Sequence, residues 1–371
     1  MDELRSSLAR LLEAGGSPVA PIRGRSIAIY GAGNCGRKVA GLARAHGLEV
    51  NAFLDSREEL TTCDGIPCFL PGSTEATHLA RTGIPVVVAI FNYATDTRPI
   101  ARLLAGRGFD RVLSYQEFHE LYGEAPDFWL TKRSYYQGRS VEVLEGFDLL
   151  DDDISRQVYH DCLAYRLNFD PESLGDPDSE RHYLPSDLPP PASPMRLLDC
   201  GAFTGDTISL FLRNGIQLEA VVAFEPDPLN YALLCANVAG FANQLGQSLL
   251  VPCGTGDRTR MAGFSAGAGA GSAIGGESIA TIQVVALDDI LASFSPTFIK
   301  LDIEGAEPLA LRGAVKTIRR SLPRLAVSVY HSPDHLWTIL KLIRELEPRY
   351  RLALRHHQRN GFDIVAYAFV G

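Results

Sequence analysis

Apolar segments of strand length alternate with segments of helix length in two blocks of this chain, and this alternation limits the fold more than any other feature. The first block covers residues 26–115 and the second covers residues 195–371. Strands that alternate with helices form parallel sheets with helices on both faces, because a crossover connection needs the length of a helix. The sequence therefore predicts an α/β fold with two doubly wound domains.

The second block contains the clearest series of strands. Helices are predicted near residues 205–213, 227–238, 306–320 and 334–346. The predicted strands are MRLLDCG, EAVVAFEP, SLLVPCG, TFIKLDIE, RLAVSVYH, YRLALRHH and FDIVAYAFV.

A proline-rich segment lies between the two blocks. The run YLPSDLPPPASP (183–194) cannot continue a helix, because proline lacks the backbone N–H and fixes φ. The segment before it is aromatic and acidic, and residues 151–170 have a helical pattern. We therefore predict a Rossmann-like domain at 1–120, a mainly helical linker or lid at 121–194 and a second Rossmann-like domain at 195–371.

The first block opens with a strand, a glycine-rich turn and a helix. The turn matches G-x-G-x-x-G at Gly31, Gly33 and Gly36, and Asp55 ends the next strand. Glycines in such a turn let the backbone approach a pyrophosphate, and the acid can bind a ribose diol. The motif favours two interpretations, a nucleotide site or a scaffold that holds no dinucleotide.

The second block repeats this order, but acids flank its turn. Asp199 precedes Gly201, and Asp206 follows Gly205. These carboxylates would repel a pyrophosphate and suit a cationic ligand, such as the sulfonium and ammonium groups of S-adenosylmethionine. Glu225 ends the next strand, where a carboxylate can accept both ribose hydroxyls. The alternative is structural, with Asp199 bonding loop amides and Glu225 stabilising a helix N-terminus.

Polar residues collect where the predicted strands of the second block end. In an open parallel sheet, ligands bind beyond the carboxyl ends of the strands. The sequence therefore predicts one site along this edge. The strand ends carry Asp199, Glu225, Cys253, Gly254, Asp302, Glu304, His331, His356 and His357.

Several motifs in fixed order resemble the FkbM-type methyltransferase family. They are DCGAFTGDT, VAFEPDP, LDD (287–289), FIKLDIEGAE with LRGA, VSVYHSPDHLW and YRLALRHH, and they cover roughly residues 195–371. The resemblance implies a class I methyltransferase-type sheet that ends in an antiparallel strand, with S-adenosylmethionine as cofactor. It also implies methylation of a hydroxyl of a sugar, glycan or natural product. The N-terminal block resembles the Rossmann-like domain fused ahead of some relatives.

The resemblance assigns roles to individual residues. It gives the glycine-loop role to Gly201 and Gly205, the ribose acid to Glu225, and an acidic motif to Asp302, Glu304 and Glu307. The cofactor-binding residues predicted from the two arguments together are Asp199, Gly201, Ala202, Phe203, Gly205, Asp206, Glu225, Pro226, Cys253 and Asp302.

Methyl transfer to a hydroxyl needs a group that accepts its proton. We predict His331 as this base, because histidine titrates nearest neutrality and Ser332-Pro333 starts a helix directly after it. Asp302 would place the methyl donor, and Glu304 would orient the acceptor or His331. Two alternatives are a His331 that only bonds a loop carbonyl, and a divalent metal on Asp302 and the histidines.

Two segments are predicted to cover the acceptor, because methyl transfer gains from the exclusion of water. They are residues 145–190 and 254–276, and the second, rich in glycine, alanine and serine, is predicted as a loop or hairpin. Tyr183 is predicted to form a wall near the cofactor, or else to be a boundary aromatic without ligand contact.

Composition limits the partners. The net charge of -9 argues against nucleic acid and anionic membranes, so we expect a small-molecule or glycan acceptor, with homo-oligomerisation as one option. Seven scattered cysteines suit the reduced thiols of a cytoplasmic protein. Two other functions compete: a non-catalytic ligand sensor or scaffold, and an NAD(P)-dependent oxidoreductase or epimerase. The latter would need a hydride-transfer constellation such as Tyr-x-x-x-Lys after the first glycine turn, and none follows.

Overall fold

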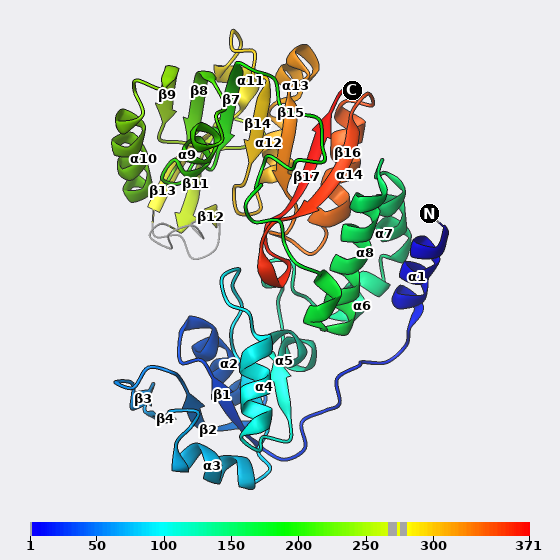
Figure 1. The fold of residues 1–371 in the computed structure, drawn as a ribbon, viewed down its shortest axis with the longest axis vertical. Helices are drawn as coiled ribbons and strands as arrows, with labels where there is room; N and C mark the ends of the chain where they lie inside the picture. The colour runs from blue at the N-terminus through cyan, green and yellow to red at the C-terminus, as the bar shows by residue number, and fades with distance from the viewer. Residues whose placement is uncertain (1, 266–272, 275–279) are drawn as a thin grey trace. The chain divides into compact units, whose positions relative to one another are not determined.

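A computed structural model describes residues 2–265, 273–274 and 280–371. The chain forms two compact units, each built around its own sheet (Figure 1). The N-terminal unit comprises Met1–Leu144, Gln157–Pro177 and Gln358–Asp363. The C-terminal unit comprises Glu145–Arg156, Asp178–His357 and Ile364–Gly371. The segment 121–194, predicted as a linker, thus contributes residues to both units.

The N-terminal unit contains a six-stranded sheet in the order β3-β4-β2-β1-β5-β6. Only the β3–β4 pair is antiparallel among the described strand pairs of this sheet. The two-residue strand β3 and its partner β4 were not anticipated, because such short strands carry little periodicity. The strands are β1 (Ser26–Tyr30), β2 (Glu49–Leu54), β3 (Thr62–Cys63), β4 (Ile66–Phe69), β5 (Val86–Val88) and β6 (Val112–Ser114).

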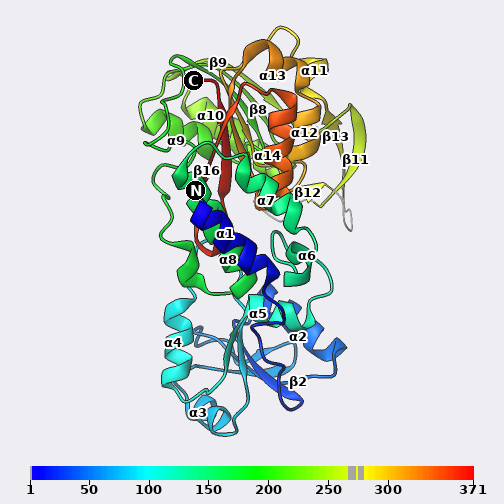
Figure 2. The same ribbon diagram turned by 90° about the vertical axis from the view of Figure 1, so that its right-hand side faces the viewer.

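Helices cover both faces of this sheet, with α3 and α4 on one face and α2 and α5 on the other (Figure 2). None of the helices within the described ranges is both long and apolar enough to cross a bilayer. The helices of the first half are α1 (Asp2–Glu13), α2 (Asn34–Ala45), α3 (Thr74–Arg81), α4 (Arg98–Gly106), α5 (Tyr115–Tyr122), α6 (Arg133–Gln137), α7 (Ser140–Asp148), α8 (Asp153–Asn168) and the 3₁₀-helix η1 (Pro171–Leu174).

The C-terminal unit contains a seven-stranded sheet in the order β16-β17-β15-β14-β7-β8-β9, visible in Figure 1. β17 runs antiparallel to both neighbours, and the other strand pairs of this sheet are parallel. The α/β fold class, and the antiparallel last strand, are therefore confirmed. The strands are β7 (Met195–Cys200), β8 (Leu218–Phe224), β9 (Leu245–Val251), β14 (Phe298–Leu301), β15 (Arg324–Ser328), β16 (Arg351–His356) and β17 (Ile364–Phe369).

The helices of this unit pack on both faces of its sheet. Figure 2 shows α9 and α10 on one face and α12, α13 and α14 on the other. On the face covered by α9 and α10, buried apolar side chains form a core, in which Phe211 of α9 meets Phe298 of β14 with ring centroids 5.4 Å apart. The helices are α9 (Asp206–Arg213), α10 (Pro228–Gly240), α11 (Leu287–Ile290), α12 (Glu307–Arg312), α13 (Val315–Ser321), α14 (His335–Leu346) and the 3₁₀-helix η3 (Arg359–Gly361).

The segment predicted as a loop or hairpin forms part of a small second sheet. β11 (Arg260–Ser265) pairs antiparallel with β13 (Ala280–Val285), and two short strands, β10 (Gly254–Thr255) and β12 (Ala273–Ile274), extend it. Alternate apolar residues explain the strands, because Ala262, Phe264, Ile282 and Val284 form a buried cluster. The rest of the predicted loop, 266–272 and 275–276, lies outside the described residues.

Candidate active site

The predicted acids and His331 lie at one edge of the C-terminal sheet. They stand at the carboxyl ends of β7, β8 and β14 and directly after β15. Asp199 on β7 lies directly opposite Lys300 on β14 in the strand register. His331 follows β15, which pairs in parallel with β14. The parallel pairing places these ends together, as the sequence predicts.

The glycine loop after β7 depends on Gly201. This residue has φ +81°, which side-chain-bearing residues rarely adopt, and a Cβ there would lie 1.9 Å from the carbonyl oxygen of Asp302. The amides of Gly201 and Ala202 both donate to the Phe224 carbonyl. The loop is thereby fixed between the ends of β8 and β14.

Gly201→Ala tests this close approach. We expect the substitution to lower the free energy of unfolding by about 2–5 kcal/mol, because the new Cβ meets both the φ penalty and a backbone clash. Gly215→Ala is the matched control, since Gly215 has φ +75° but open space around its Cα. Chemical denaturation compares the two variants. Equal losses of stability would contradict a steric role for the Asp302 carbonyl.

Glu225 organises the same loop from the end of β8. One of its oxygens accepts the amide of Phe203 at 2.8 Å, and the other accepts the amide of Asp227 at 2.9 Å. Glu225 is only 5% exposed. Its bond to Asp227, the N-cap residue of α10, fits the helix N-terminal role weighed against ligand binding, but each carboxylate oxygen can accept a second hydrogen bond. Both roles are therefore compatible.

Lys300 is the charged residue that the sequence interpretation missed. Its Nζ lies 3.3 Å from Asp199 Oδ1 and 3.9 Å from Asp302 Oδ2, and it donates to the Gly201 carbonyl at 2.6 Å. Burial lowers the pKa of Lys300, but the carboxylates of Asp199 and Asp302 outweigh it and raise the pKa above its ordinary value. The sequence did contain a signal for this pair, because Lys300 stands within the apolar run FIKL. All four residues of this strand are buried, and a buried lysine needs a partner.

His331 lies among carboxylates. Its Nδ1 is 2.8 Å from Glu307 Oε1, and its Nε2 is 3.5 Å from Asp302 Oδ1 and 3.6 Å from Glu304 Oε2. The imidazole is 1% exposed. Burial lowers the pKa of His331, but the charge and hydrogen bond of Glu307, with the other two acids, raise it to about 10.

This environment corrects the premise on which His331 was predicted to act as a base. That prediction assumed a pKa near neutrality, whereas three surrounding carboxylates stabilise the imidazolium. A protonated ring has no free nitrogen to accept the proton of an acceptor hydroxyl, so the raised pKa disfavours the role of base. A fixed positive charge between Asp302 and Glu304 is the role that this geometry supports.

Tyr183 contacts the same cluster. Its hydroxyl donates to Asp302 Oδ2 at 3.1 Å, and its ring stacks on His182 with centroids 3.8 Å apart. Burial raises the pKa of Asp302, but Lys300 and His331 lower it to about 2, so Asp302 stays ionised. Tyr183 thus packs against the acidic site, and its contact with the cofactor stays a prediction.

Asp302, Glu307 and His331 also form a group that could hold a metal ion, since their ligand atoms lie within 4.8 Å of one another. However, Glu307 Oε1 already accepts the amide of Ile303 at 2.9 Å and bonds His331. A metal there would have to displace the proton between Glu307 and His331.

The other predicted residues differ in exposure. Asp206 is exposed as the first residue of α9, and Cys253 is 9% exposed just after β9. Pro226 is half-buried beside Glu225. His357, predicted at the same edge, bonds the Asp178 carbonyl at 2.7 Å and the Tyr367 hydroxyl at 2.8 Å, and so fastens the chain before β7 to the sheet. His356 is 8% exposed.

The glycine turn of the N-terminal unit has the expected geometry, but its acid, Asp55, is already bound by Arg57. Gly31 has φ +100°, and a Cβ on Gly36 would lie 1.9 Å from the Gly31 carbonyl oxygen. Asp55 Oδ2 accepts the amide of Ala32 at 2.9 Å, and Arg57 binds both Asp55 oxygens at 2.9 Å. The Arg57 guanidinium thus covers the carboxylate that a ribose diol would need. Gly33 caps α2 without a side-chain bond.

Part of this sequence matches a protein family, and the structure is similar to solved structures. Residues 199–363 match the family described as Methyltransferase FkbM domain. None of the curated proteins matches the chain in sequence. The structure is similar to the methyltransferase FkbM from Methylobacillus flagellatus KT, with a TM-score of 0.82, 22% identity and 99% of each chain covered. This likeness shows the shared fold along the whole chain.

Two further solved structures are more distant. A putative rRNA methylase from Clostridium thermocellum has a TM-score of 0.31 and 8% identity, covering 48% of this chain and 87% of its own. Precorrin-6y C5,15-methyltransferase from Geobacter metallireducens GS-15 has a TM-score of 0.30 and 12% identity, covering 67% and 94%. Likenesses this weak carry no argument about the present chain.

Proposed function

We propose that this chain, a methyltransferase whose residues 199–363 belong to the FkbM family, transfers a methyl group from S-adenosylmethionine to a hydroxyl of a sugar, glycan or natural product. The observation that carries this proposal is the acid-flanked glycine loop with Glu225 at the end of the adjacent strand. A loop of this kind suits a cationic nucleoside ligand and disfavours a pyrophosphate.

The residues at this edge fit the cofactor. Neither oxygen of Asp199 has a hydrogen bond of good geometry to any described residue, and its contact with Lys300 is an ion pair. Gly201 leaves the loop backbone free of side-chain bulk, and Glu225 keeps acceptor capacity for ribose hydroxyls. S-adenosylmethionine would supply an electrophilic methyl group on its sulfonium.

The acidic centre would handle the acceptor. Asp302 and Glu304 both face Nε2 of His331, at 3.5 and 3.6 Å, and the positive charge of the ring helps to lower the pKa of Asp302. Their side chains are 23% and 18% exposed, so an incoming hydroxyl can reach them. We propose that these carboxylates hold the acceptor hydroxyl and receive its proton.

Glu225→Ala is expected to weaken S-adenosylmethionine binding at least about tenfold, because a charged hydrogen bond to a ribose hydroxyl contributes about 1.5–3 kcal/mol. Isothermal titration calorimetry on the full chain measures this affinity. Glu219→Ala is the control, since Glu219 lies exposed at the opposite end of the same strand. An affinity equal to that of the unmodified protein would remove Glu225 from the cofactor site.

The reaction itself is tested with radiolabelled S-adenosylmethionine and fractionated sugars, glycans and natural-product extracts. Label in a base-stable ether would support O-methylation. Cofactor binding without transfer to any fraction would favour the sensor or scaffold alternative. Oxidation of NAD(P)H with one of the same fractions would favour the oxidoreductase.

A further inference from the structure

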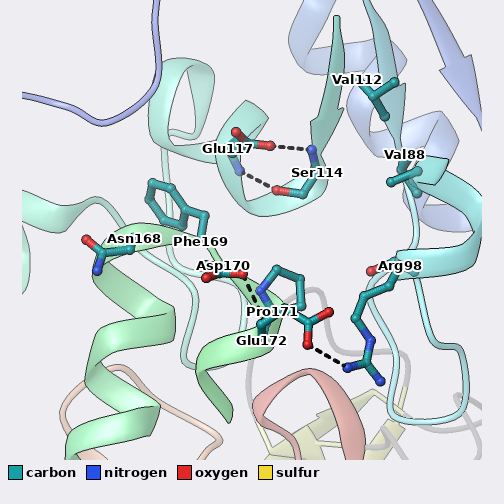
Figure 3. A pocket seen from close by; sticks show the side chains of 12 residues that line it. Val88, Arg98, Val112, Ser114, Glu117, Asn168, Phe169, Asp170, Pro171 and Glu172 are labelled. Carbon is teal, nitrogen blue, oxygen red and sulfur yellow. Dashed lines mark hydrogen bonds and ion pairs between the residues drawn. The ribbon is translucent and has the colours of Figure 1, made fainter. Parts of the chain in front are cut away.

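The N-terminal unit contains a cavity of about 400 Å³ at the carboxyl ends of β5 and β6 (Figure 3). Val88 ends β5 and Ser114 ends β6, so the cavity opens at the edge where ligands of parallel sheets bind. The segment Asn168–Glu172 forms the facing wall. Small-molecule sites typically measure about 300–1,000 Å³.

Hydrogen bonds within the walls hold this cavity in shape. Ser114 and Glu117 form a reciprocal capping box at the start of α5. Asp170 caps η1 by accepting the amide of Glu172 at 3.0 Å. Glu172 in turn binds Arg98 of α4 at 3.3 Å, which joins the two sides of the cavity, as Figure 3 shows. A preformed site loses little entropy when it binds.

The lining is acidic. It contains the carboxylates of Glu117, Asp170 and Glu172 and one base, Arg98. Arg98 is held by both oxygens of Asp96, at 2.9 and 2.8 Å, and by Glu172, and Arg359 lies 3.6 Å from the same Asp96, so these two bases and two acids balance and leave Glu117 and Asp170 as the excess negative charge. A phosphate or carboxylate ligand would meet uncompensated negative charge here. The cavity therefore disfavours the phosphates of a nucleotide.

The remaining surface combines apolar and hydroxyl-binding groups. Val88, Ala101, Val112 and Phe169 supply the apolar part. Carboxylates accept hydrogen bonds, whereas Arg98 donates them, and a sugar hydroxyl can do both. The C–H face of a sugar ring can pack on apolar side chains while its rim of hydroxyls meets the polar ones.

We propose that this cavity binds a sugar ring that carries no negative charge. Binding at the cavity is independent of methyl transfer, but its use in recognising a glycan acceptor rests on the proposed function. Both a neutral hexose and an amino sugar are sugars without negative charge. The acidic lining favours the amino sugar, because its amine is protonated.

The test titrates the full chain with individual probes and follows saturation-transfer NMR signals of each. The probes are methyl glycosides of glucose, galactose and mannose, glucosamine, and glucose 6-phosphate. We expect at least one uncharged or amino sugar to bind, and glucose 6-phosphate to bind at least about tenfold more weakly or not at all. Stronger binding of glucosamine than of every neutral sugar identifies the amine as the favoured ligand, and the reverse identifies the neutral sugar.

Two variants locate the binding. Ala101→Phe, which fills the cavity from α4, should weaken sugar binding at least about tenfold. Glu172→Gln, at the 63% exposed rim, should reduce the discrimination against glucose 6-phosphate. Glu142→Gln on the exposed face of α7 should change neither.

Three results would overturn the proposal: no binding of any uncharged or amino sugar, equal or tighter binding of glucose 6-phosphate, or full affinity in Ala101→Phe. S-adenosylmethionine affinity is measured on the same samples. Loss of sugar binding with intact cofactor binding would refute the cavity alone, whereas absent cofactor binding with intact sugar binding would refute the proposed function alone.

Discussion

Lys300→Met is expected to lower the free energy of unfolding by about 3–5 kcal/mol, because it leaves the Asp199 carboxylate buried without its counter-charge. Asp199 is 0% exposed and Lys300 is 3% exposed, so water cannot replace the lost partner. The Gly201 carbonyl also loses its donor. Urea denaturation at pH 7 measures the loss, and calorimetry should show weakened S-adenosylmethionine binding.

A double variant separates the two consequences. Asp199→Asn combined with Lys300→Met removes both charges and should recover part of the lost stability, since neither charge is then left alone. Cofactor binding should stay weak, because the Gly201 carbonyl of the glycine loop still lacks its donor, Lys300. Lys316→Met, at an exposed position of α13, is the control. A double variant no more stable than Lys300→Met would show that the ion pair does not carry the stability.

The sequence was sufficient for the sheet of the C-terminal unit and for the edge that carries the site. Its strands are apolar runs bounded by polar residues, and the parallel order places their carboxyl ends together. Glu225 and Asp302 could be placed at this edge because each directly follows such a run. The local pattern of an apolar run followed by an acid was therefore enough to place these two residues.

Charge balance could not be predicted in the same way, because it depends on how the loops fold charged side chains onto one another. The pKa of His331 follows from Glu307, Glu304 and Asp302, and the short loop between β14 and α12 brings all three to one imidazole. Asp55 matched a ribose acid in sequence, yet Arg57 folds back onto it. In both cases the neighbouring charge, and not the residue type, decides the chemistry.

His331→Gln is expected to change how stability depends on pH. The unfolded chain loses the histidine proton above about pH 6.5, whereas the folded protein keeps it up to about pH 10. The bound proton therefore stabilises the fold fully below pH 6.5, and this contribution falls by up to about 1.4 kcal/mol per pH unit as the pH rises towards 10. Urea denaturation at pH 7, 8 and 9 measures the difference between the unmodified protein and the variant.

The difference in stability between the two proteins should shrink steadily across this series, because groups common to both cancel. Parallel curves would show that His331 is neutral in the folded protein, and the imidazolium between Asp302 and Glu304 would have to be abandoned.

The rate of methyl transfer then distinguishes the two catalytic roles of His331, a proton-accepting base and a fixed positive charge. A rate that rises through pH 7–9 in the unmodified protein, and no longer does so in His331→Gln, would restore His331 as the base, since only its deprotonated form could accept the hydroxyl proton. A rate that is constant with pH but much reduced in His331→Gln fits a fixed charge that holds the two carboxylates in place, because that charge persists across the whole range.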